Sequence, residues 1–315
     1  MNIVYSSDEN YIQHLAVSIY SLLKNNEHVP NINIFILSNE IAEISKEKIR
    51  QIVTSKFNRT ISFVDFDPYK QNLKLNMEWE ISLSSYARLF LCEMLPHNTE
   101  KVIYIDCDTV IMGSLLELWD MDMQNYSVAG VIDTVLPEFK KAIGLTEIDF
   151  YINAGILLID LNKWRNDNIQ MKFMSFIAEK SGRVSHHDQG TINAVLHNDI
   201  LPIHPKYNSM TPFFTTNYKN LLEIYNIKGE YYTETQIAEA KKNPIIIHYV
   251  PEFVGRVWEK GCIHPRKKFY KKYLNLTDFK GHFLPNSNKL DFKKRIIYLI
   301  NCKAPIWLKN FFFNR

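Results

Sequence analysis

Apolar residues recur along the first part of the chain with two alternating periods. β-Strands are predicted for short runs rich in Ile, Val and Phe at residues 2–7, 32–38 and 61–66, because such side chains favour extended backbone. Between these runs, apolar positions return every three or four residues, which is typical of amphipathic helices. The two predicted helices carry Tyr11, Leu15, Ile19, Leu22 and Leu23, and Ile41, Ile44, Ile49, Ile52 and Val53.

The same alternation continues to about residue 250. A further helix is expected from near Ser84, and strands are predicted at residues 101–106, 126–133, 153–161 and 244–250. Strands that alternate with helices predict a three-layer α/β domain on a mostly parallel central sheet. The sequence has no internal repeat and no low-complexity linker to divide this domain.

Polar residues with useful chemistry lie where the predicted strands end. Asp8, Asp106, Asp108, Asp133 and His248 are each at, or just beyond, the end of a predicted strand. In open α/β sheets, ligands bind in the crevice beyond the carboxyl ends of the strands. We therefore expect these side chains to converge on one site.

The composition is that of a folded protein. Of the 315 residues, 46% are apolar and 23% are charged, which excludes disorder for most of the chain. Four scattered cysteines are too few for a disulfide framework and favour a reducing compartment. The N-terminus has no basic leader, and no apolar run reaches the roughly 18 residues of a membrane span, so a cytoplasmic protein is expected.

The net charge of +3 is unevenly distributed along the chain. Residues 286–315 contain seven Lys or Arg and one Asp, a net charge of +6, so residues 1–285 carry −3. The basic character therefore belongs to the C-terminal tail. A mildly acidic main part without a binding motif argues against a nucleic-acid partner.

The run KVIYIDCDTVI, residues 101–111, ends its apolar part in two aspartates, Asp106 and Asp108. Asp is a common turn and N-cap residue, so the pair could simply terminate the strand. Two such close carboxylates repel each other unless a cation lies between them, and Mg²⁺ or Mn²⁺ is held by carboxylates together with substrate phosphates. Both aspartyl-nucleophile phosphohydrolases and nucleotide-sugar glycosyltransferases fit this pattern. The phosphohydrolase is disfavoured because its later acidic pair, Asp-Asp, does not occur.

Six segments resemble, in their order and spacing, the conserved blocks of family 8 glycosyltransferases. They are VYSSDENYIQHLAVSIYSLL at residues 4–23, SSYARLFL at 84–91, KVIYIDCDTVIMGSLLELW at 101–119, YINAGILLIDLNKW at 151–164, HHDQGTINAVL at 186–196 and IIIHYV at 245–250. The similarity extends over residues 1 to about 265. It is greatest to bacterial enzymes that add galactose or glucose to lipopolysaccharide cores or other surface glycans.

This resemblance implies a GT-A-type fold, a UDP-sugar donor, a Mn²⁺ ion with Mg²⁺ as the alternative, and retention of the anomeric configuration. The expected activity is transfer of a hexose, galactose or glucose, to a hydroxyl of a lipid-linked or cell-surface glycan such as lipopolysaccharide core. A catalytically silent UDP-sugar-binding or lectin-like module is the alternative. The presence of all three metal-ligand positions, Asp106, Asp108 and His248, argues against it.

The resemblance also implies roles for individual residues. Asp106, Asp108 and His248 match metal ligands. Residues that match the UDP-sugar site are Ser6, Asp8, Asn10, Tyr11, Arg88, Asp106, Asn153, Ala154, Gly155, Asp188, Gln189, Gly255 and Arg256. Catalytic roles fall to Arg88, Asp133, Asp188 and Gln189. Without the resemblance, Tyr11 would be interpreted as a core residue and Arg88 as a solvated one.

The expected reaction is a front-face substitution through an oxocarbenium-like state. Gln189 matches the position beneath the anomeric carbon, and its amide oxygen is a poor nucleophile. Asp188 is the less favoured nucleophile. The sequence departs from the family at the place where a lysine usually binds diphosphate. In HYVPEFVGRVWEKG, residues 248–261, Gly255 and Arg256 come later than the family's glycine and lysine, so Arg256, Lys260 or neither could take this role.

A catalytic domain is expected over residues 1–265, followed by a basic and aromatic region over 266–315 with a short helical tail. The tail mixes Lys and Arg with Ile, Trp and Phe and ends near Phe311–Phe313. Such a segment favours an anionic membrane surface, here the inner face of the plasma membrane, because exposed Phe side chains need a partner. A helix packed on the domain, with its lysines solvated, is the alternative.

Overall fold

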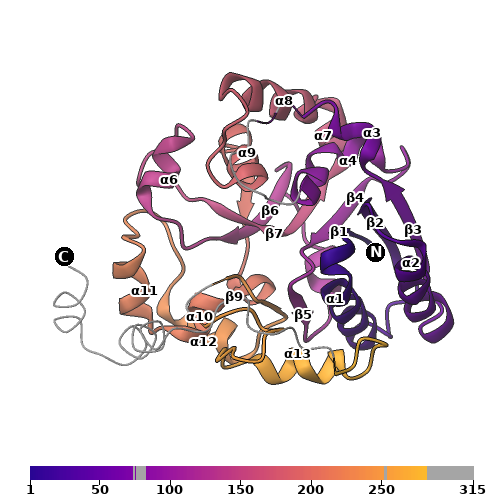
Figure 1. Ribbon diagram of the computed structural model, residues 1–315. Coiled ribbons are helices and arrows are strands. Elements are labelled where there is room, and N and C mark those ends of the chain that lie inside the picture. The colour runs from indigo at the N-terminus through magenta and orange to yellow at the C-terminus, as the bar shows by residue number, and fades with distance from the viewer. Residues whose placement is uncertain (74, 76–82, 252–253, 282–315) are drawn as a thin grey trace.

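The computed structural model describes residues 1–73, 75, 83–251 and 254–281. Within them the largest sheet has seven strands (Figure 1). The strand order across this sheet is β3 (Thr60–Asp65), β2 (Asn33–Asn39), β1 (Asn2–Asp8), β4 (Lys101–Ile105), β7 (Ile152–Asp160), β6 (Val128–Ile132) and β8 (Ile200–Pro202). Every strand predicted between residues 2 and 161 is present, with ends that agree to within two residues.

The sheet is mostly parallel, as predicted, with one exception among the described strands. β7 pairs antiparallel with both β4 and β6, whereas the other pairings are parallel. The beginning of β7 therefore lies at the edge where β4 and β6 end. Backbone hydrogen bonds fix this arrangement: the Asp106 amide donates to the Gly155 carbonyl (2.7 Å), and the Asp133 amide donates to the Tyr151 carbonyl (2.7 Å).

Helices cover both faces of the sheet, and the alternation of side chains along each strand explains which residues meet them. On β1, Ile3 and Tyr5 belong to the core under α1 (Ile12–Asn25) and α2 (Glu43–Arg50). Val4 belongs to a second core on the opposite face, together with residues of α7 (Leu161–Asn166) and α8 (Ile169–Glu179). Figure 1 shows α7 and α8 on the other side of the sheet from α1. Burial on both faces accounts for the almost continuous apolar runs of these strands.

A second sheet of three short strands lies beside the first. It consists of β5 (Thr109–Ile111), β10 (Ile246–His248) and β9 (Ser209–Met210). The run at 244–250, predicted as a member of the central sheet, forms β10 in this second sheet instead. β10 pairs antiparallel with β5, so that His248 stands opposite Thr109, next to Asp108. An apolar run specifies a buried strand but not the sheet that receives it.

The shorter elements complete the described chain. The helix expected from Ser84 is a 3₁₀ helix, η3 (Leu83–Phe90), followed by α4 (Leu91–Met94). The others are η1 (Glu9–Tyr11), the π-helical segment η2 (Gln51–Lys56), α3 (Asp67–Lys70), α5 (Leu116–Trp119), α6 (Pro137–Ala142), α9 (His187–Val195), η4 (Pro205–Asn208), α10 (Thr211–Thr215), α11 (Tyr218–Ile224) and α12 (Glu234–Lys242). None of the described helices has the length and hydropathy needed to cross a membrane.

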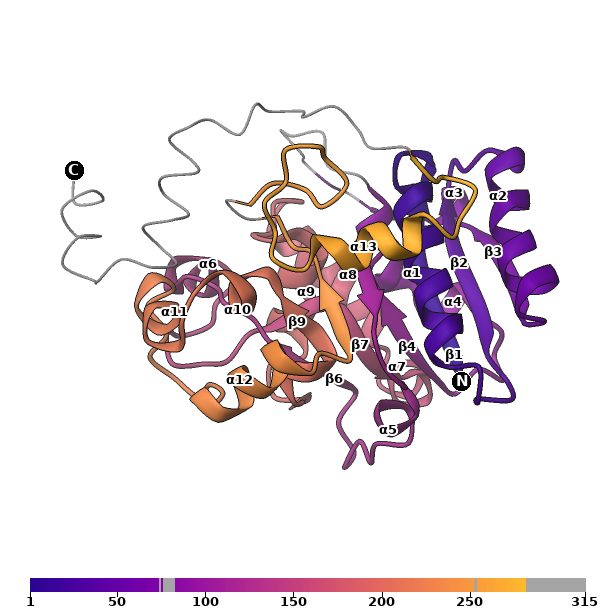
Figure 2. The ribbon, with the colours of Figure 1, turned by 90° about the horizontal axis from the view of Figure 1, so that it is seen from below.

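The last described helix, α13 (Lys267–Leu274), packs against α1 and crosses it (Figure 2). Its Tyr270, Tyr273 and Leu274 are buried, and the Tyr270 hydroxyl contacts His14 Nδ1 at 2.6 Å. The start of the region expected at 266–315 is thus packed on the main domain. The helical tail and its aromatic end, residues 282–315, lie outside the described residues, and the domain boundary at 265 stays a prediction.

Candidate active site

A cavity of about 1130 Å³ opens at the edge of the sheet where β1, β4 and β6 end and β7 begins. Every predicted site residue lines it except Gly155 and Gly255. Those in its wall are Ser6, Asp8, Asn10, Tyr11, Arg88, Asp106, Asp108, Asp133, Asn153, Ala154, Asp188, Gln189, His248 and Arg256. The convergence expected from the strand ends is confirmed.

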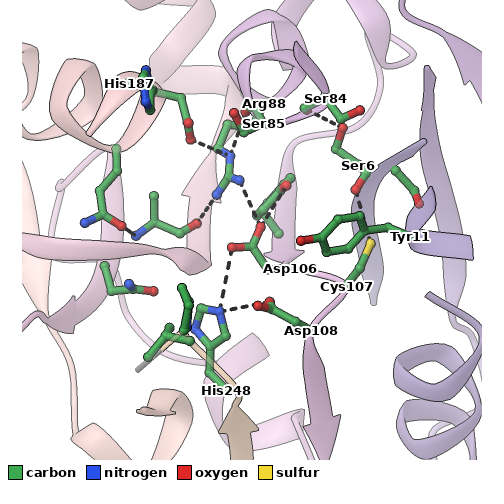
Figure 3. A pocket seen from close by; sticks show the side chains of 18 of the residues that line it. Ser6, Tyr11, Ser84, Ser85, Arg88, Asp106, Cys107, Asp108, His187 and His248 are labelled. Atoms are coloured by element: carbon green, nitrogen blue, oxygen red, sulfur yellow. Dashed lines mark hydrogen bonds and ion pairs between the residues drawn. The ribbon is translucent and has the colours of Figure 1, made fainter. Parts of the chain in front are cut away.

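Asp106, Asp108 and His248 form one cluster in this wall (Figure 3). One ligand atom from each lies within 4.8 Å of the others. His248 Nε2 is 3.1 Å from Asp108 Oδ1 and 3.9 Å from Asp106 Oδ2. Two carboxylates and one imidazole aimed at a common point could hold a divalent cation such as Mn²⁺.

The charged groups of this cluster stabilise one another's ionised forms. Burial opposes ionisation of Asp108, but His248 and Arg256 outweigh it and hold the pKa of that carboxyl below its usual value. Burial likewise opposes a charge on His248, but Asp108 and Asp106 outweigh it and raise the pKa of the imidazole. A cation bound between the three groups would replace this internal compensation.

Arg88 lies on the opposite side of Asp106 from His248 (Figure 3). Only 4% of the residue is exposed, so the reading of Arg88 as a solvated helix residue is wrong. Its guanidinium donates to Asp106 Oδ1 (2.9 Å) and to the carbonyl of Ala154, and it forms an ion pair with Asp188 Oδ2 (2.9 Å). It also lies 4.1 Å from the centre of the Tyr104 ring. Arg88 therefore bridges the metal-ligand cluster and the end of the cavity that contains Asp188.

Asp188 stands at the start of α9 and is almost fully buried. Burial raises the pKa of its carboxyl above the usual value, although Arg88 and a hydrogen bond from Ser85 act in the opposite direction. The ion pair occupies Oδ2. A carboxylate so engaged is a weaker nucleophile than a free one.

Carboxamides line the adjacent part of the cavity and are connected to one another. Asn153 Nδ2 and Gln189 Nε2 both donate to Asp133 Oδ2, at 3.0 and 2.9 Å. Gln189 Oε1 accepts from the Ala154 amide at 3.0 Å. A pocket rich in oriented amides and one carboxylate can exchange these hydrogen bonds for those of sugar hydroxyls.

Gly155 does not line the cavity, yet the cluster depends on it. A Cβ at this position would stand 2.3 Å from His248 Cε1 and 2.8 Å from Asp106 Oδ2. Any larger residue would push these two side chains apart. The role implied for Gly155 is therefore better described as spacing of the two ligands than as contact with a donor.

The first loop builds the other end of the cavity. The Asp8 carboxylate accepts from the Asn10 amide at 3.0 Å and begins η1. Ser6 Oγ donates to the Ser84 carbonyl at 2.5 Å. Tyr11 is partly buried, with its ring edge-on to His14 and to Trp258, and burial raises its pKa to about 12. Its ring both packs on the core and faces the cavity.

Arg256, rather than Lys260, is positioned beside the cluster. Arg256 Nη1 lies 3.5 Å from Asp108 Oδ2, and its guanidinium lies 5.2 Å from the Trp258 ring centre. Lys260 is exposed and does not line the cavity. Gly255 has a φ of +76°, a conformation that favours glycine and turns the chain just before Arg256.

Several residues of the site were not predicted from the sequence. Asn208 is completely buried, and its Oδ1 lies 3.0 Å from His248 Nδ1. His186 and His187 line the cavity with positive φ angles, and the sequence offered a signal for them in the HHDQG block. Asn208 offered none, because it is a single amide, at the end of η4, outside the six segments that resemble the family. Other polar or aromatic residues of the wall that were not predicted include Ser7, Glu9, Asn39, Glu40, Ser84, Ser85, Tyr104 and Thr134.

Comparison with known proteins agrees with this geometry. The chain is 34% identical over 269 residues to a putative glycosyltransferase of Haemophilus influenzae, a match that covers 84% of this chain and 74% of that one. It is 28% identical over 309 residues to a lipopolysaccharide 1,2-glucosyltransferase of Escherichia coli K12, with 95% and 85% covered.

A solved structure shares the fold. The galactosyltransferase LgtC, crystallised with donor and acceptor sugar analogues, superimposes with a TM-score of 0.73 at 23% identity. The match covers 88% of this chain and 96% of that one, which confirms the expected GT-A-type fold. The sequence profile of "Glycosyl transferase family 8" matches residues 2–258. Those residues hold the whole cavity wall, so the chain is a glycosyltransferase that belongs to family 8.

Proposed function

We propose that this glycosyltransferase transfers a hexose, galactose or glucose, from a UDP-sugar to a hydroxyl of a surface glycan, with a divalent cation and with retention of configuration. The observation that carries the proposal is the Asp106–Asp108–His248 cluster, which shares one cavity with Arg88 and the Asp133 amide network. The family assignment supports the reaction class. The names of the relatives, a lipopolysaccharide 1,2-glucosyltransferase and a galactosyltransferase, support the choice of sugars and acceptor.

The donor set fits Mn²⁺, with Mg²⁺ as the alternative. Two carboxylates and an imidazole combine hard oxygen ligands with a nitrogen that Mn²⁺ accepts. His248 Nδ1 is engaged by Asn208, so Nε2 is the atom directed at Asp106 and Asp108. Once bound, the cation would neutralise negative charge that builds on the diphosphate.

We assign the remaining residues of the site to three parts of the donor: the uridine, the diphosphate and the hexose. Ser6, Asp8, Asn10 and Tyr11 lie at the end of the cavity that we assign to uridine, where Tyr11 offers an aromatic face. Arg256 lies beside Asp108, next to the cluster that would hold the cation, and is therefore placed to contact the diphosphate. Its guanidinium can bind one phosphate group through two N–H donors. The Asp133 network and Asp188 lie where we place the hexose, whose hydroxyls would replace some of the internal hydrogen bonds.

We infer a front-face substitution. The bond between C1 and the diphosphate oxygen breaks, the acceptor oxygen bonds to C1 from the same side, and its proton passes to the departing phosphate. The ion pair of Asp188 with Arg88 supports this choice over a covalent intermediate, and the Gln189 amide is a weak nucleophile. Mass spectrometry of the protein after reaction with a slow donor tests it, because a sugar covalently bound to Asp188 would contradict the front-face route.

The decisive assay measures UDP release from a panel of nucleotide hexoses with and without Mn²⁺. We expect UDP-glucose or UDP-galactose to be turned over only with the metal, and Asp108→Ala to lower the rate by at least about 100-fold. Asp122→Ala removes an exposed carboxylate away from the cavity and serves as the control. Tight donor binding without any turnover would identify the silent sugar-binding module instead.

We further propose that residues 266–315 attach the enzyme to the cytoplasmic face of the plasma membrane, where a lipid-linked acceptor would lie. The support is the sequence, with basic residues interspersed among Ile, Trp and Phe. Flotation of the full chain with vesicles of anionic or neutral lipid tests it. Binding to both lipids alike, or unchanged binding after Lys293, Lys294 and Arg295 are replaced by Glu, would contradict the proposal.

A further inference from the structure

A chain of buried hydrogen bonds connects the hexose end of the cavity to the metal-ligand cluster. It begins at the Asp133 carboxylate and continues through the side chains of Asn153 and Asn208 to the imidazole of His248. The three links are Asn153 Nδ2 to Asp133 Oδ2 (3.0 Å), Asn208 Nδ2 to Asn153 Oδ1 (2.8 Å), and Asn208 Oδ1 to His248 Nδ1 (3.0 Å).

The chain has only one consistent direction. The Asp133 carboxylate can only accept, so Asn153 must turn its NH₂ group toward it. The oxygen of Asn153 then faces Asn208 and also accepts from the Gly155 amide at 2.9 Å. Asn208 must therefore donate to Asn153 and present its own oxygen to His248. That oxygen can only accept, so Nδ1 of His248 must carry a proton.

Burial keeps this direction fixed. Asn208 is 0% exposed, His248 3% and Asn153 6%, so water has little access to satisfy a reversed amide. Turning either amide would bring two acceptors or two donors together inside the protein, which is costly where the dielectric is low. The Asp133 carboxylate, together with the Gly155 amide, thus determines which way the amides of Asn153 and Asn208 point.

We propose that Asn208 is a positioning residue that passes the orientation set by Asp133 to His248 and so keeps the lone pair of Nε2 available for the cation. The inference rests on the proposed metal-dependent function. Metal-binding histidines commonly donate their other ring nitrogen to an oxygen, and that partner strengthens the ligand. Asn208 provides this oxygen for His248. Unlike a simple partner, it also donates a hydrogen bond to Asn153, a residue of the proposed hexose pocket.

Two substitutions separate the two contacts of Asn208. Asn208→Leu introduces a side chain of similar size and removes both hydrogen bonds, the one to Asn153 and the one to His248. Asn208→Asp keeps an oxygen for His248 Nδ1 but cannot donate to Asn153. We expect Mn²⁺ binding to the full chain to weaken about 10- to 100-fold in Asn208→Leu and to stay equal or become tighter in Asn208→Asp. The KM for the donor should rise about tenfold in Asn208→Asp, because the Asn153 contact is lost.

Mn²⁺ affinity is measured by electron paramagnetic resonance of the free ion, without substrate, so the readout does not depend on turnover. Asn26→Leu is the control, since Asn26 is also fully buried and bridges two segments, Leu22 and Leu115, away from the cavity. It should lower the unfolding temperature and leave Mn²⁺ affinity unchanged.

The outcomes distinguish this inference from the function on which it rests. If the parent chain binds no Mn²⁺, the proposed function fails, and the inference fails with it. If the parent binds Mn²⁺ and folded Asn208→Leu binds it equally well, only the inference is overturned. If Asn208→Leu does not fold, Asn208→Asp still decides, because a loss of Mn²⁺ affinity greater than tenfold in that variant contradicts the proposed role.

Discussion

Arg88→Met should destabilise the protein strongly and in a way that depends on pH. Methionine has a comparable length and no charge, so it removes the guanidinium without opening a large cavity. The change leaves Asp106 and Asp188, each 2.9 Å from Arg88 in the parent, without their shared cation. It also removes hydrogen bonds to the carbonyls of Ser85 (3.0 Å) and Ala154.

The magnitude follows from the burial of the pair. The Arg88 side chain is 5% exposed and that of Asp188 is 8% exposed, so solvent screens their attraction little. Removal of one partner of a buried ion pair typically costs 3–5 kcal/mol, because an uncompensated charge remains inside. We expect a loss of about 4 kcal/mol in the free energy of unfolding at pH 7, a large part of the total for most domains.

The pH dependence gives a second, independent readout. Burial already raises the pKa of Asp188, and Arg88 opposes that rise. Without Arg88 the rise is larger, so the folded variant keeps a proton to higher pH than the unfolded chain does. The contribution of Asp188 to the free energy of unfolding of the variant is therefore fully present below the pKa that Asp188 has in the unfolded chain. It is lost as pH increases toward the pKa of Asp188 in the folded variant, by up to about 1.4 kcal/mol per pH unit.

Urea unfolding followed by tryptophan fluorescence, at intervals between pH 5 and pH 8, measures both quantities. The free-energy difference between parent and Arg88→Met should widen as pH rises. Arg50→Met is the control, since Arg50 is 40% exposed and pairs with Glu43 and Glu47 at the surface. A loss below 1 kcal/mol, or parallel pH profiles for parent and variant, would refute the view that Arg88 compensates two buried carboxylates.

Two further predictions concern residues around the cluster. Gly155→Ala should weaken Mn²⁺ binding at least about tenfold, because its Cβ would meet His248 and Asp106; Gly144→Ala, strained by a φ of +92° but free of close neighbours, should leave binding unchanged. Tyr270→Phe should cost about 1–3 kcal/mol of unfolding free energy and raise the donor KM, because it removes the partner of His14, on which Trp258 stacks. The matched change in α13, Tyr273→Phe, removes a hydroxyl that accepts from Asn25 Nδ2 (2.7 Å) and should lower stability without changing KM.

Sequence patterns predicted the central strands well because those strands are buried on both faces. β1, β4 and β6 appear as mainly apolar runs, and the aspartates at or just after their ends (Asp8, Asp106 and Asp133) mark the carboxyl edge of the sheet. The patterns were less informative where pairing decides the structure. The run at 244–250 had the composition of any buried strand, and only its pairing with β5 places His248 beside Asp108.

The polar residues of the site show the same limit. Helical periodicity marks Arg88 as a residue of the polar face, but it does not reveal that this face looks onto Asp106 and Asp188. Asn208 has no local signal at all. Its partners are 40 and 55 residues away in sequence, and its importance arises only when the fold brings them together.

The direction of β7 is what makes one compact site from these distant segments. β7 has nine residues, so a parallel strand of that length would place Asn153 about 23 Å and Gly155 about 17 Å from the carboxyl edge where β4 delivers Asp106. Because β7 runs antiparallel to β4, its first residues meet that edge directly, and the Gly155 carbonyl accepts from the Asp106 amide. The exception to the mostly parallel sheet is therefore the strand that joins the hexose pocket to the metal-ligand cluster. A glycine at the point of contact is needed because no side chain fits between Asp106 and His248.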